Sequence, residues 1–369
     1  MLFSCLSPPR NSNKRQRTCS SGIASLTLFI FSYLPVGLIA STLVMSDPRA
    51  DLLNLLGGEW VSQGIYVAAK LDIAHHLQEG PKTTRELSEL LEVDEEALYR
   101  VMGMLASHGV FEQREGKIFA NTPMSERISH NHPDTLRSLA IFYGEEIRDA
   151  FGSLLVSVKS GSPAFDQVYQ EPVFDYFKHN PQRAALFQSA MAEKSKAVMQ
   201  SVIQQVNFKG TVCDVGGGKG HLLYAILNAN PNLEGINFDL PEVIASLPKA
   251  PPRATFQEGS FFEAIPQADT YLMKSVLHDW SDEKAIEILQ VCHASMPDPS
   301  TLYVIEPVLI HSQDHDYAKL MDVLMLAVTG GRERSLTQYE ALFEKSGFTI
   351  TNILSTPTEF RIIELKKKL

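Results

Sequence analysis

The stretch Val212-Cys213-Asp214-Val215-Gly216-Gly217-Gly218-Lys219-Gly220 decides the fold. Its apolar start is typical of a buried strand, and apolar residues at helical spacing follow over residues 221–228. Glycines between a strand and a helix allow a tight turn and let a ligand approach the backbone. We therefore expect a ligand-binding loop at the carboxyl end of the first strand of an α/β sheet.

The apolar runs around and after this loop predict the rest of the sheet. Seven short β-branched or apolar runs predict strands at 211–215, 234–238, 254–257, 270–273, 301–305, 348–353 and 359–365. Helical segments separate the early runs, so those strands are expected to be parallel and covered on both faces. The predicted fold class is α/β, with a Rossmann-like, mostly parallel sheet of seven strands in a domain at 209–369.

The spacing of the glycines separates two classes of cofactor. A dinucleotide fingerprint requires G-x-G-x-x-G, but the sixth position counted from Gly216 is His221. Counted from Asp214, the loop reads acid-x-G-x-G-x-G, with Gly216 and Gly218 among its glycines, and this pattern is associated with S-adenosylmethionine. Asp239 closes the second strand and can bind both ribose hydroxyls, although nicotinamide cofactors use such an acid too. We favour S-adenosylmethionine over a nicotinamide cofactor and over an ordinary glycine turn.

Three further polar residues follow predicted strands, where open α/β sheets bind their ligands. His278 follows the fourth strand, Glu306 stands directly after the fifth, and Glu333 lies in the glycine-rich segment 330–334. A histidine there can act as a general base, and a carboxylate bonded to it stabilises the imidazolium. We predict catalytic roles for the three residues; the alternative is a packed structural histidine. The sequence offers no clear metal cluster, and no metal is predicted.

Residues 46–130 predict a separate domain, helical except for one hairpin. Helical spacing covers 51–77, with interruptions at 57–58 and at Gly64, and helices are expected at 83–93 and 94–108 before a hairpin over 110–120. This order is that of a winged helix-turn-helix. Residues 81–120 hold five basic and eight acidic side chains, the reverse of a DNA-reading surface. We favour a dimer-forming module.

Residues 131–208 predict a helical linking layer, broken near 161–163 and 180–181. Its bulky side chains suit either core packing or the walls of an apolar substrate pocket, and they are Phe142, Tyr143, Phe151, Phe165, Phe174, Tyr176, Phe177, Phe187 and Met191. We expect this layer to contribute the substrate pocket.

The charge balance, the cysteines and the first 45 residues bear on partners and location. With 33 Lys+Arg and 43 Asp+Glu the formal charge is −10, which argues against nucleic acid. Four cysteines without a CxxC pair favour a reduced, cytoplasmic protein. Residues 21–45 lack charged side chains, so the leader 1–45 is a membrane anchor, a signal peptide or an extension ahead of a start at Met45. We favour a start at Met45.

Together these motifs resemble those of one family. The segments 214–218, 238–241, 273–280 and 330–334 are similar, in order and spacing, to those of S-adenosylmethionine-dependent O-methyltransferases of the plant caffeic acid and hydroxyindole type and their bacterial natural-product relatives. The resemblance implies a class I methyltransferase sheet, a winged-helix-like dimerisation domain, a homodimer and a small aromatic substrate with a hydroxyl. It implies that His278 is the base and that Glu306 and Glu333 flank it.

The resemblance also assigns the cofactor contacts. The candidate residues are Asp214, Gly216, Gly218, Asp239, Leu240, Ser260, Phe261 and Lys274. Ser260 stands where many relatives have an aspartate facing the adenine, and Lys219 stands where Thr or Ser is common. Ser260 can accept a hydrogen bond only without charge assistance, which would weaken cofactor binding, although Phe261 can still cover the ring. The Lys219 cation is unfavourable beside a sulfonium unless its side chain points to solvent or to the methionyl carboxylate. The rival interpretations are a catalytically silent dimer that binds S-adenosylmethionine and an enzyme that uses the same fold without methylating.

Overall fold

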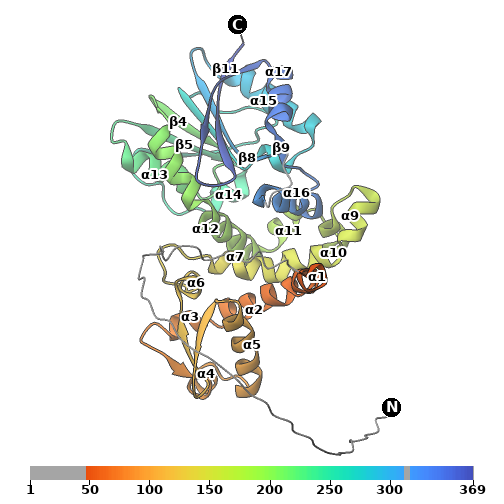
Figure 1. Cartoon of the computed structure of the whole chain (residues 1–369). Coiled ribbons are helices and arrows are strands. Elements are labelled where there is room, and N and C mark those ends of the chain that lie inside the picture. Colours follow the sequence, from red (N-terminus) through yellow and green to blue (C-terminus); the bar gives the residue numbers. More distant parts are fainter. Residues whose placement is uncertain (1–46, 311–315, 369) are drawn as a thin grey trace, which may run out of the picture. The chain divides into compact units, whose positions relative to one another are not determined.

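The structure is a computed structural model that describes residues 47–310 and 316–368 (Figure 1). The predicted leader 1–45 lies outside the described residues. Among the residues from 47 onward that are described, no helix is both long and apolar enough to cross a membrane. Leu52–Leu369 forms one unit by its internal contacts, so the predicted domain boundaries near 130 and 208 stay predictions.

The N-terminal part of the described chain is mainly helical. Its helices are α1 (Pro48–Leu56), α2 (Gly58–Lys70), α3 (Ile73–His76), α4 (Thr84–Leu91), α5 (Glu95–Ser107) and α6 (Pro123–Glu126). A capping box begins α4, because Thr83 Oγ1 accepts from the Glu86 N–H at 3.2 Å and Glu86 Oε2 accepts from the Thr83 N–H at 2.7 Å. Asp94 caps α5 through Ala97. The predicted break at 57–58 is confirmed.

The predicted interruption at Gly64 is wrong, because this glycine lies inside α2. A Cβ at Gly64 would lie 2.5 Å from the Met104 side chain, so the missing side chain lets α2 pack closely on α5. The predicted hairpin is present as the antiparallel strands β2 (Phe111–Arg114) and β3 (Ile118–Asn121). A two-residue strand, β1 (Lys82–Thr83), pairs with β3 and completes a small sheet that the sequence did not predict.

A run of helices connects this part to the large sheet. The run consists of α7 (Arg137–Phe142), the π-helix η1 (Tyr143–Ile147), α8 (Arg148–Gly152), α9 (Leu154–Ser160), α10 (Ala164–Tyr169), α11 (Val173–His179) and α12 (Pro181–Gln205). The predicted breaks at 161–163 and 180–181 are confirmed. Phe142, Phe165 and Phe177 are buried in one apolar cluster, so these rings serve core packing.

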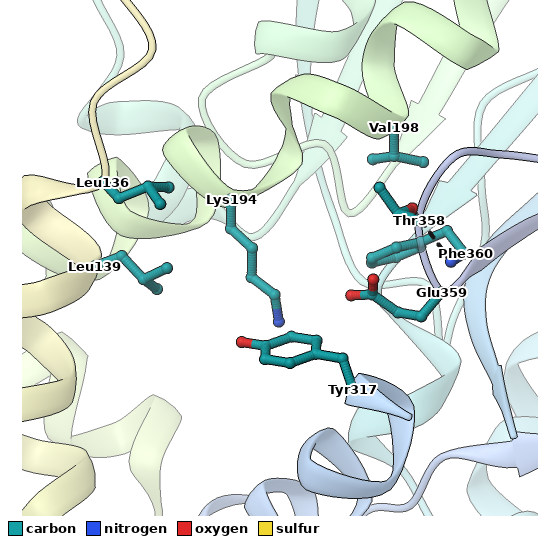
Figure 2. Close-up of a pocket in the computed structure, with 8 residues that line it drawn as sticks. All are labelled: Leu136, Leu139, Lys194, Val198, Tyr317, Thr358, Glu359 and Phe360. Atoms are coloured by element: carbon teal, nitrogen blue, oxygen red, sulfur yellow. Dashed lines mark hydrogen bonds between the residues drawn. The ribbon is translucent and has the colours of Figure 1, made fainter. Parts of the chain in front are cut away.

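Two cavities border this helical run. One, of about 320 Å³, is lined by Leu136, Leu139, Lys194, Val198, Tyr317, Thr358, Glu359 and Phe360 (Figure 2). The other, of about 330 Å³, shares Leu136 and Leu139 with it and extends toward α2. Only one of the nine bulky residues singled out in the sequence, Tyr143, lines one of these two cavities, and it lines the second. Which residues line the substrate pocket therefore stays a prediction.

The C-terminal sheet contains the seven predicted strands and one more. They are β4 (Thr211–Val215), β5 (Glu234–Asp239), β6 (Ala254–Glu258), β7 (Thr270–Lys274), β8 (Thr301–Leu309), β9 (Arg334–Ser335), β10 (Phe348–Ser355) and β11 (Phe360–Lys367). The order is β10-β11-β8-β7-β4-β5-β6, and the short, unpredicted β9 pairs with β8. β4 to β8 are mutually parallel, and β10 and β11 are antiparallel.

Helices cover both faces of this sheet, as expected (Figure 1). The helices of this part are α13 (His221–Ala229), α14 (Pro241–Ala245), the short 3₁₀ helix η2 (Leu277–Asp279), α15 (Asp282–Ser295), α16 (Tyr317–Val328) and α17 (Leu336–Lys345). α12 and α13 cover one face, and α15 and α17 cover the other. Along β4, Val212 packs with α12 and α13, whereas Cys213 and Val215 pack with α15 and α17. The strand order changes direction at β4, so a crevice is expected outside the carboxyl ends of β4, β5 and β7.

Candidate active site

The glycine loop and Asp239 meet at this carboxyl edge. Gly216 and Gly218 have left-handed backbone angles, φ +73° and +56°, which glycine adopts most readily. The Gly218 N–H donates to Asp239 Oδ2 at 2.8 Å, and the Leu240 N–H donates to Asp239 Oδ1 at 2.7 Å. Each carboxylate oxygen keeps a further lone pair, and the side chain is partly exposed. Asp239 can thus accept hydrogen bonds from the hydroxyls of a ligand while it holds the glycine loop in place.

The buried Asp214 and the half-buried Lys274 lie close enough to influence each other's charge. Burial raises the pKa of Asp214 to about 7, and the nearby Lys274 opposes that shift. Burial lowers the pKa of Lys274, which donates from Nζ to Ser195 Oγ of α12 at 3.0 Å. Lys274 thus joins the end of β7 to α12.

The two departures from the family pattern have structural partners. The Ser260 hydroxyl accepts from the Phe262 N–H at 3.2 Å, so it stabilises its own turn. Lys219 Nζ donates to Ser189 Oγ at 3.3 Å and to the Ala185 carbonyl at 3.4 Å, both on α12. The Lys219 ammonium is therefore directed to that helix.

The carboxyl edge of the sheet fits S-adenosylmethionine by its shape and by the carboxylate that it offers as a hydrogen-bond acceptor. A Cβ at Gly216 would lie 2.9 Å from Val276 and 3.8 Å from the Phe261 ring, so the cradle depends on glycine. Phe261 lies near this loop and packs at 6.1 Å from the Trp280 ring. An aromatic ring beside a glycine cradle suits an adenine, and Asp239 suits its ribose.

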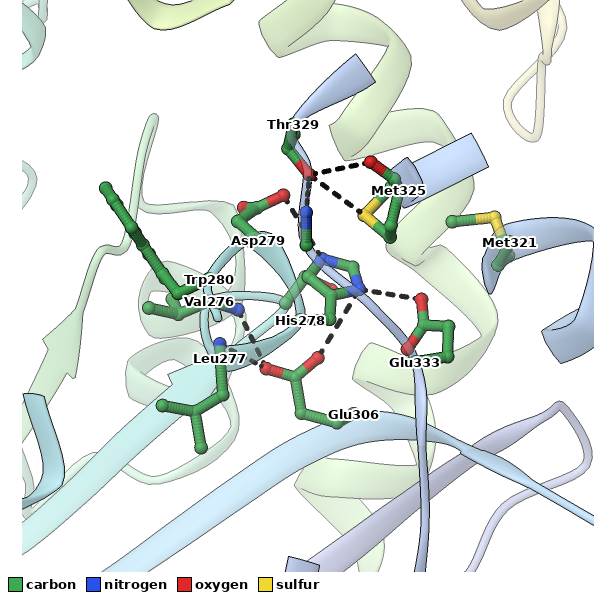
Figure 3. A network of polar contacts seen from close by, with 12 residues as sticks. Val276, Leu277, His278, Asp279, Trp280, Glu306, Met321, Met325, Thr329 and Glu333 are labelled. Atoms are coloured by element: carbon green, nitrogen blue, oxygen red, sulfur yellow. Dashed lines mark hydrogen bonds and ion pairs between the residues drawn. The ribbon is translucent and has the colours of Figure 1, made fainter. Parts of the chain in front are cut away.

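His278 lies in η2 and is 6% exposed, with two glutamates around one of its nitrogens (Figure 3). Nδ1 is 2.8 Å from Glu333 Oε1 and 3.7 Å from Glu306 Oε2. Nε2 is 3.9 Å from Asp279 Oδ1, beyond hydrogen-bond distance. The bond at Nδ1 fixes the ring and leaves Nε2 as the nitrogen that can accept a proton.

Glu306 lies inside β8, not directly after the strand, which corrects the prediction. β8 pairs with β11 as far as Pro307, with Arg361 opposite Glu306, and its last residues, Val308 and Leu309, pair with β9. Glu306 Oε1 accepts from the N–H groups of Val276 and Leu277, each at 2.8 Å. Glu306 therefore orients the backbone that carries His278 while its second oxygen faces the imidazole.

Burial sets the charge of the acids around His278. Glu306 and Glu333 are fully buried, and burial raises the pKa of Glu306 and takes that of Glu333 to about 8. Burial likewise raises the pKa of Asp279 to about 6, although His278 opposes this. Near neutral pH the neutral form of Glu333 is thus favoured, and its carbonyl oxygen can still accept the hydrogen bond from Nδ1.

His278, Glu306 and Glu333 also have ligand atoms within 4.8 Å of one another, the spacing of a possible metal site. Ligands about 2.0–2.2 Å from a tetrahedral metal lie more than about 3 Å apart. The 2.8 Å contact from His278 to Glu333 is shorter and has hydrogen-bond length. The geometry is that of a hydrogen-bonded acid–imidazole cluster.

Two positioning residues were missed by the sequence reasoning. Arg334 is 1% exposed and donates to the carbonyls of Leu277 and Trp280, both at 2.8 Å. A Cβ at Gly331 would lie 2.0 Å from the His278 carbonyl oxygen, so the two loops touch at the backbone. Both residues belong to the segment 330–334 that the sequence analysis singled out. The signal that could have identified them was the arginine directly after Glu333 and the glycine two positions before it.

Comparisons with known proteins match both parts of the described chain. A family model described as the O-methyltransferase domain matches residues 151–349, and one described as the O-methyltransferase dimerisation domain matches residues 53–130. Phenazine O-methyltransferase PhzM of Lysobacter antibioticus is 35% identical over 324 residues, which cover 85% of this chain and 95% of that protein.

Two further comparisons also match methyltransferases over most of this chain. O-demethylpuromycin-O-methyltransferase of Streptomyces alboniger is 32% identical over 329 residues, or 85% of this chain and 88% of that protein. The crystal structure of human N-acetylserotonin methyltransferase in complex with S-adenosylmethionine superimposes with a TM-score of 0.82 at 25% identity, covering 88% of this chain and 99% of that one.

Proposed function

The chain belongs to the family of S-adenosylmethionine-dependent O-methyltransferases, and we propose that it methylates a hydroxyl of a small aromatic molecule with His278 as the general base. The observation that carries the proposal is the arrangement of the imidazole. Nδ1 is held by Glu333 at 2.8 Å, and Nε2 has no hydrogen-bond partner among the described residues. A proton acceptor of this kind is what an attacking hydroxyl requires.

When bound, S-adenosylmethionine supplies a methyl group activated by a positively charged sulfur. His278 Nε2 takes the proton of the acceptor hydroxyl as that oxygen becomes nucleophilic. Glu333 accepts the hydrogen bond from Nδ1 and, with Glu306, stabilises the imidazolium that forms. Most of the acceleration comes from holding the two reactants in line, and the base contributes about 10²–10⁴-fold.

The proposed cofactor contacts follow from the carboxyl edge. Asp239 binds the ribose hydroxyls, the backbone at Gly216, Gly218 and Leu240 borders the cofactor, and Phe261 covers the adenine. Asp214 and Lys274 support the loop from behind, and Ser260 contributes through its turn. The aspartate missing at residue 260 removes a charge-assisted bond, so we expect looser adenine binding than an aspartate would give.

The acceptor proposed is a flat molecule of a few rings. Relatives are named for phenazine and for O-demethylpuromycin as acceptors of methylation at oxygen. Another is named phenazine-1-carboxylate N-methyltransferase, so transfer to nitrogen is the alternative outcome for this chain. The matched dimerisation domain supports a homodimer as the active form.

One experiment tests the proposal in two steps. The full chain is titrated by calorimetry with S-adenosylhomocysteine, with NAD in parallel, and is then incubated with S-adenosylmethionine and hydroxylated aromatic acceptors. We expect micromolar binding of S-adenosylhomocysteine alone and products heavier by one methylene, with the methyl on oxygen. Binding without any methylated product would favour the silent dimer, and binding of NAD would contradict the cofactor assignment.

A further inference from the structure

The cavity of about 320 Å³ is lined by one ammonium, that of the half-buried Lys194 (Figure 2). Lys194 extends from α12 into the cavity, where its Nζ lies 2.7 Å from Met321 Sδ and 5.5 Å from the centre of the Tyr317 ring. Leu136, Leu139 and other apolar side chains form much of the remaining wall. A thioether is a weak acceptor, and burying a charge without a strong partner is costly.

The described part of the chain offers Lys194 no ion pair within 4.0 Å. Burial lowers the pKa of Lys194 to about 8, and the nearest carboxylates that oppose this are Glu359 and Glu333. Glu333 is itself favoured as the neutral acid near neutral pH, since burial raises its pKa to about 8. Within the described part of the chain the ammonium thus has no carboxylate within 4.0 Å, and Glu359, on the same cavity wall, is the acid that most favours its charged form.

The cavity lies next to the catalytic cluster. Met321, which touches Lys194, precedes Asp322, and Asp322 accepts from the Glu333 N–H at 2.9 Å. Lys194 and Glu333 also shift one another's pKa, which requires proximity. On the other side, Ser195 bonds Lys274 at 3.0 Å. The cavity wall is therefore connected to Glu333 through α16 and to Lys274 through α12.

We propose that Lys194 is a specificity residue that binds a carboxylate on the aromatic acceptor, in addition to the hydroxyl that is methylated. This inference rests on the proposed function, since it names the class of acceptor that the same site takes. The apolar wall suits the rings, and a single ammonium suits a single carboxylate. Glu359 lines the same cavity and has the opposite charge, so it makes a discriminating control.

The test compares acids with their amides. The full chain, saturated with S-adenosylhomocysteine, is titrated with hydroxybenzoates and hydroxynaphthoates and with the corresponding amides, which keep the shape and lose the charge. We expect at least one acid to bind about 10–100-fold more tightly than its amide. Amides that bind as tightly as the acids throughout, or acids that do not bind at all, would overturn the inference.

Variants assign the preference to the ammonium. Lys194→Met is expected to bring acid and amide within about threefold of each other, with S-adenosylhomocysteine binding retained as evidence of folding. Lys194→Arg should keep part of the preference, and Glu359→Gln should keep or increase it. A preference that survives Lys194→Met, or one that Glu359→Gln abolishes equally, would overturn the assignment.

Methyl transfer is measured separately on the same compounds. Transfer to the amides as fast as to the acids would leave the proposed function standing and remove this inference. Acids that bind in a Lys194-dependent way but are never methylated would contradict the proposed function instead.

Discussion

At the scale of single residues, burial decides how the acids around His278 act. Glu333 is fully buried and its pKa lies near 8, so the folded protein holds it protonated over a range in which the unfolded chain ionises it. The unfolded state then binds fewer protons than the native state between about pH 4.5 and 8, and stability falls as the pH rises through that window.

Glu333→Gln should remove this dependence, because glutamine keeps the shape and an acceptor but does not ionise. We expect the wild type to lose more than about 1 kcal/mol relative to Glu333→Gln between pH 5 and 8, measured by denaturant unfolding. Glu340→Gln, an exposed position on α17, is the matched control and should follow the wild type. Parallel pH profiles for Glu333→Gln and the wild type would disprove the assigned pKa shift.

A second prediction at this scale concerns Asp239. Asp239→Asn keeps the size of the side chain but loses one acceptor toward the N–H groups of Gly218 and Leu240. The affinity for S-adenosylhomocysteine should fall about tenfold or more, by calorimetry. Glu234→Gln, at the exposed start of the same strand, should bind as the wild type does. An unchanged affinity in Asp239→Asn would remove Asp239 from the cofactor site.

At the scale of elements, the loop before β9 must touch the loop that carries His278. Gly331→Ala would place a Cβ 2.0 Å from the His278 carbonyl oxygen, so one loop has to move. A displacement of about 1 Å can cost about 100-fold in rate, and we expect a loss of that order in methyl transfer. The rate is measured at saturating cofactor.

Gly103→Ala is the control for this change. Gly103 lies within α5, where a Cβ would find only the end of the Gln113 side chain, at 3.8 Å. Alanine there should leave the rate unchanged and raise stability by up to about 1 kcal/mol. If Gly331→Ala retained the wild-type rate, the backbone contact would not position His278.

The same scale shows which elements the sequence could predict. The seven strands were predictable because each contains a short cluster of apolar or β-branched residues, but β9 has two residues and no such signal. The sequence identified Glu306 but ended its strand too early, because the extension of β8 depends on pairing with β11 and β9, which are distant in the sequence. Lys194 was missed since periodicity along α12 does not tell which side borders a cavity.

At the scale of the whole molecule, the apolar surface of the N-terminal helices predicts association. Leu55, Leu56 and Trp60 are 78%, 64% and 70% exposed, which is unusual for side chains of this size. We expect a dimer in sedimentation velocity, as the matched dimerisation domain indicates. Leu55→Glu with Leu56→Lys should shift the protein toward monomer, whereas Glu89→Lys on exposed α4 should not. A wild-type monomer would contradict this assembly.

The central claim is that His278 is the base for methyl transfer, and single-turnover transfer by His278→Ala tests it most directly. S-adenosylhomocysteine titration first establishes that the variant folds and binds the cofactor product. The account predicts wild-type binding with transfer to a hydroxylated aromatic acceptor slowed about 10²–10⁴-fold at neutral pH. Transfer within a few fold of the wild-type rate would contradict it.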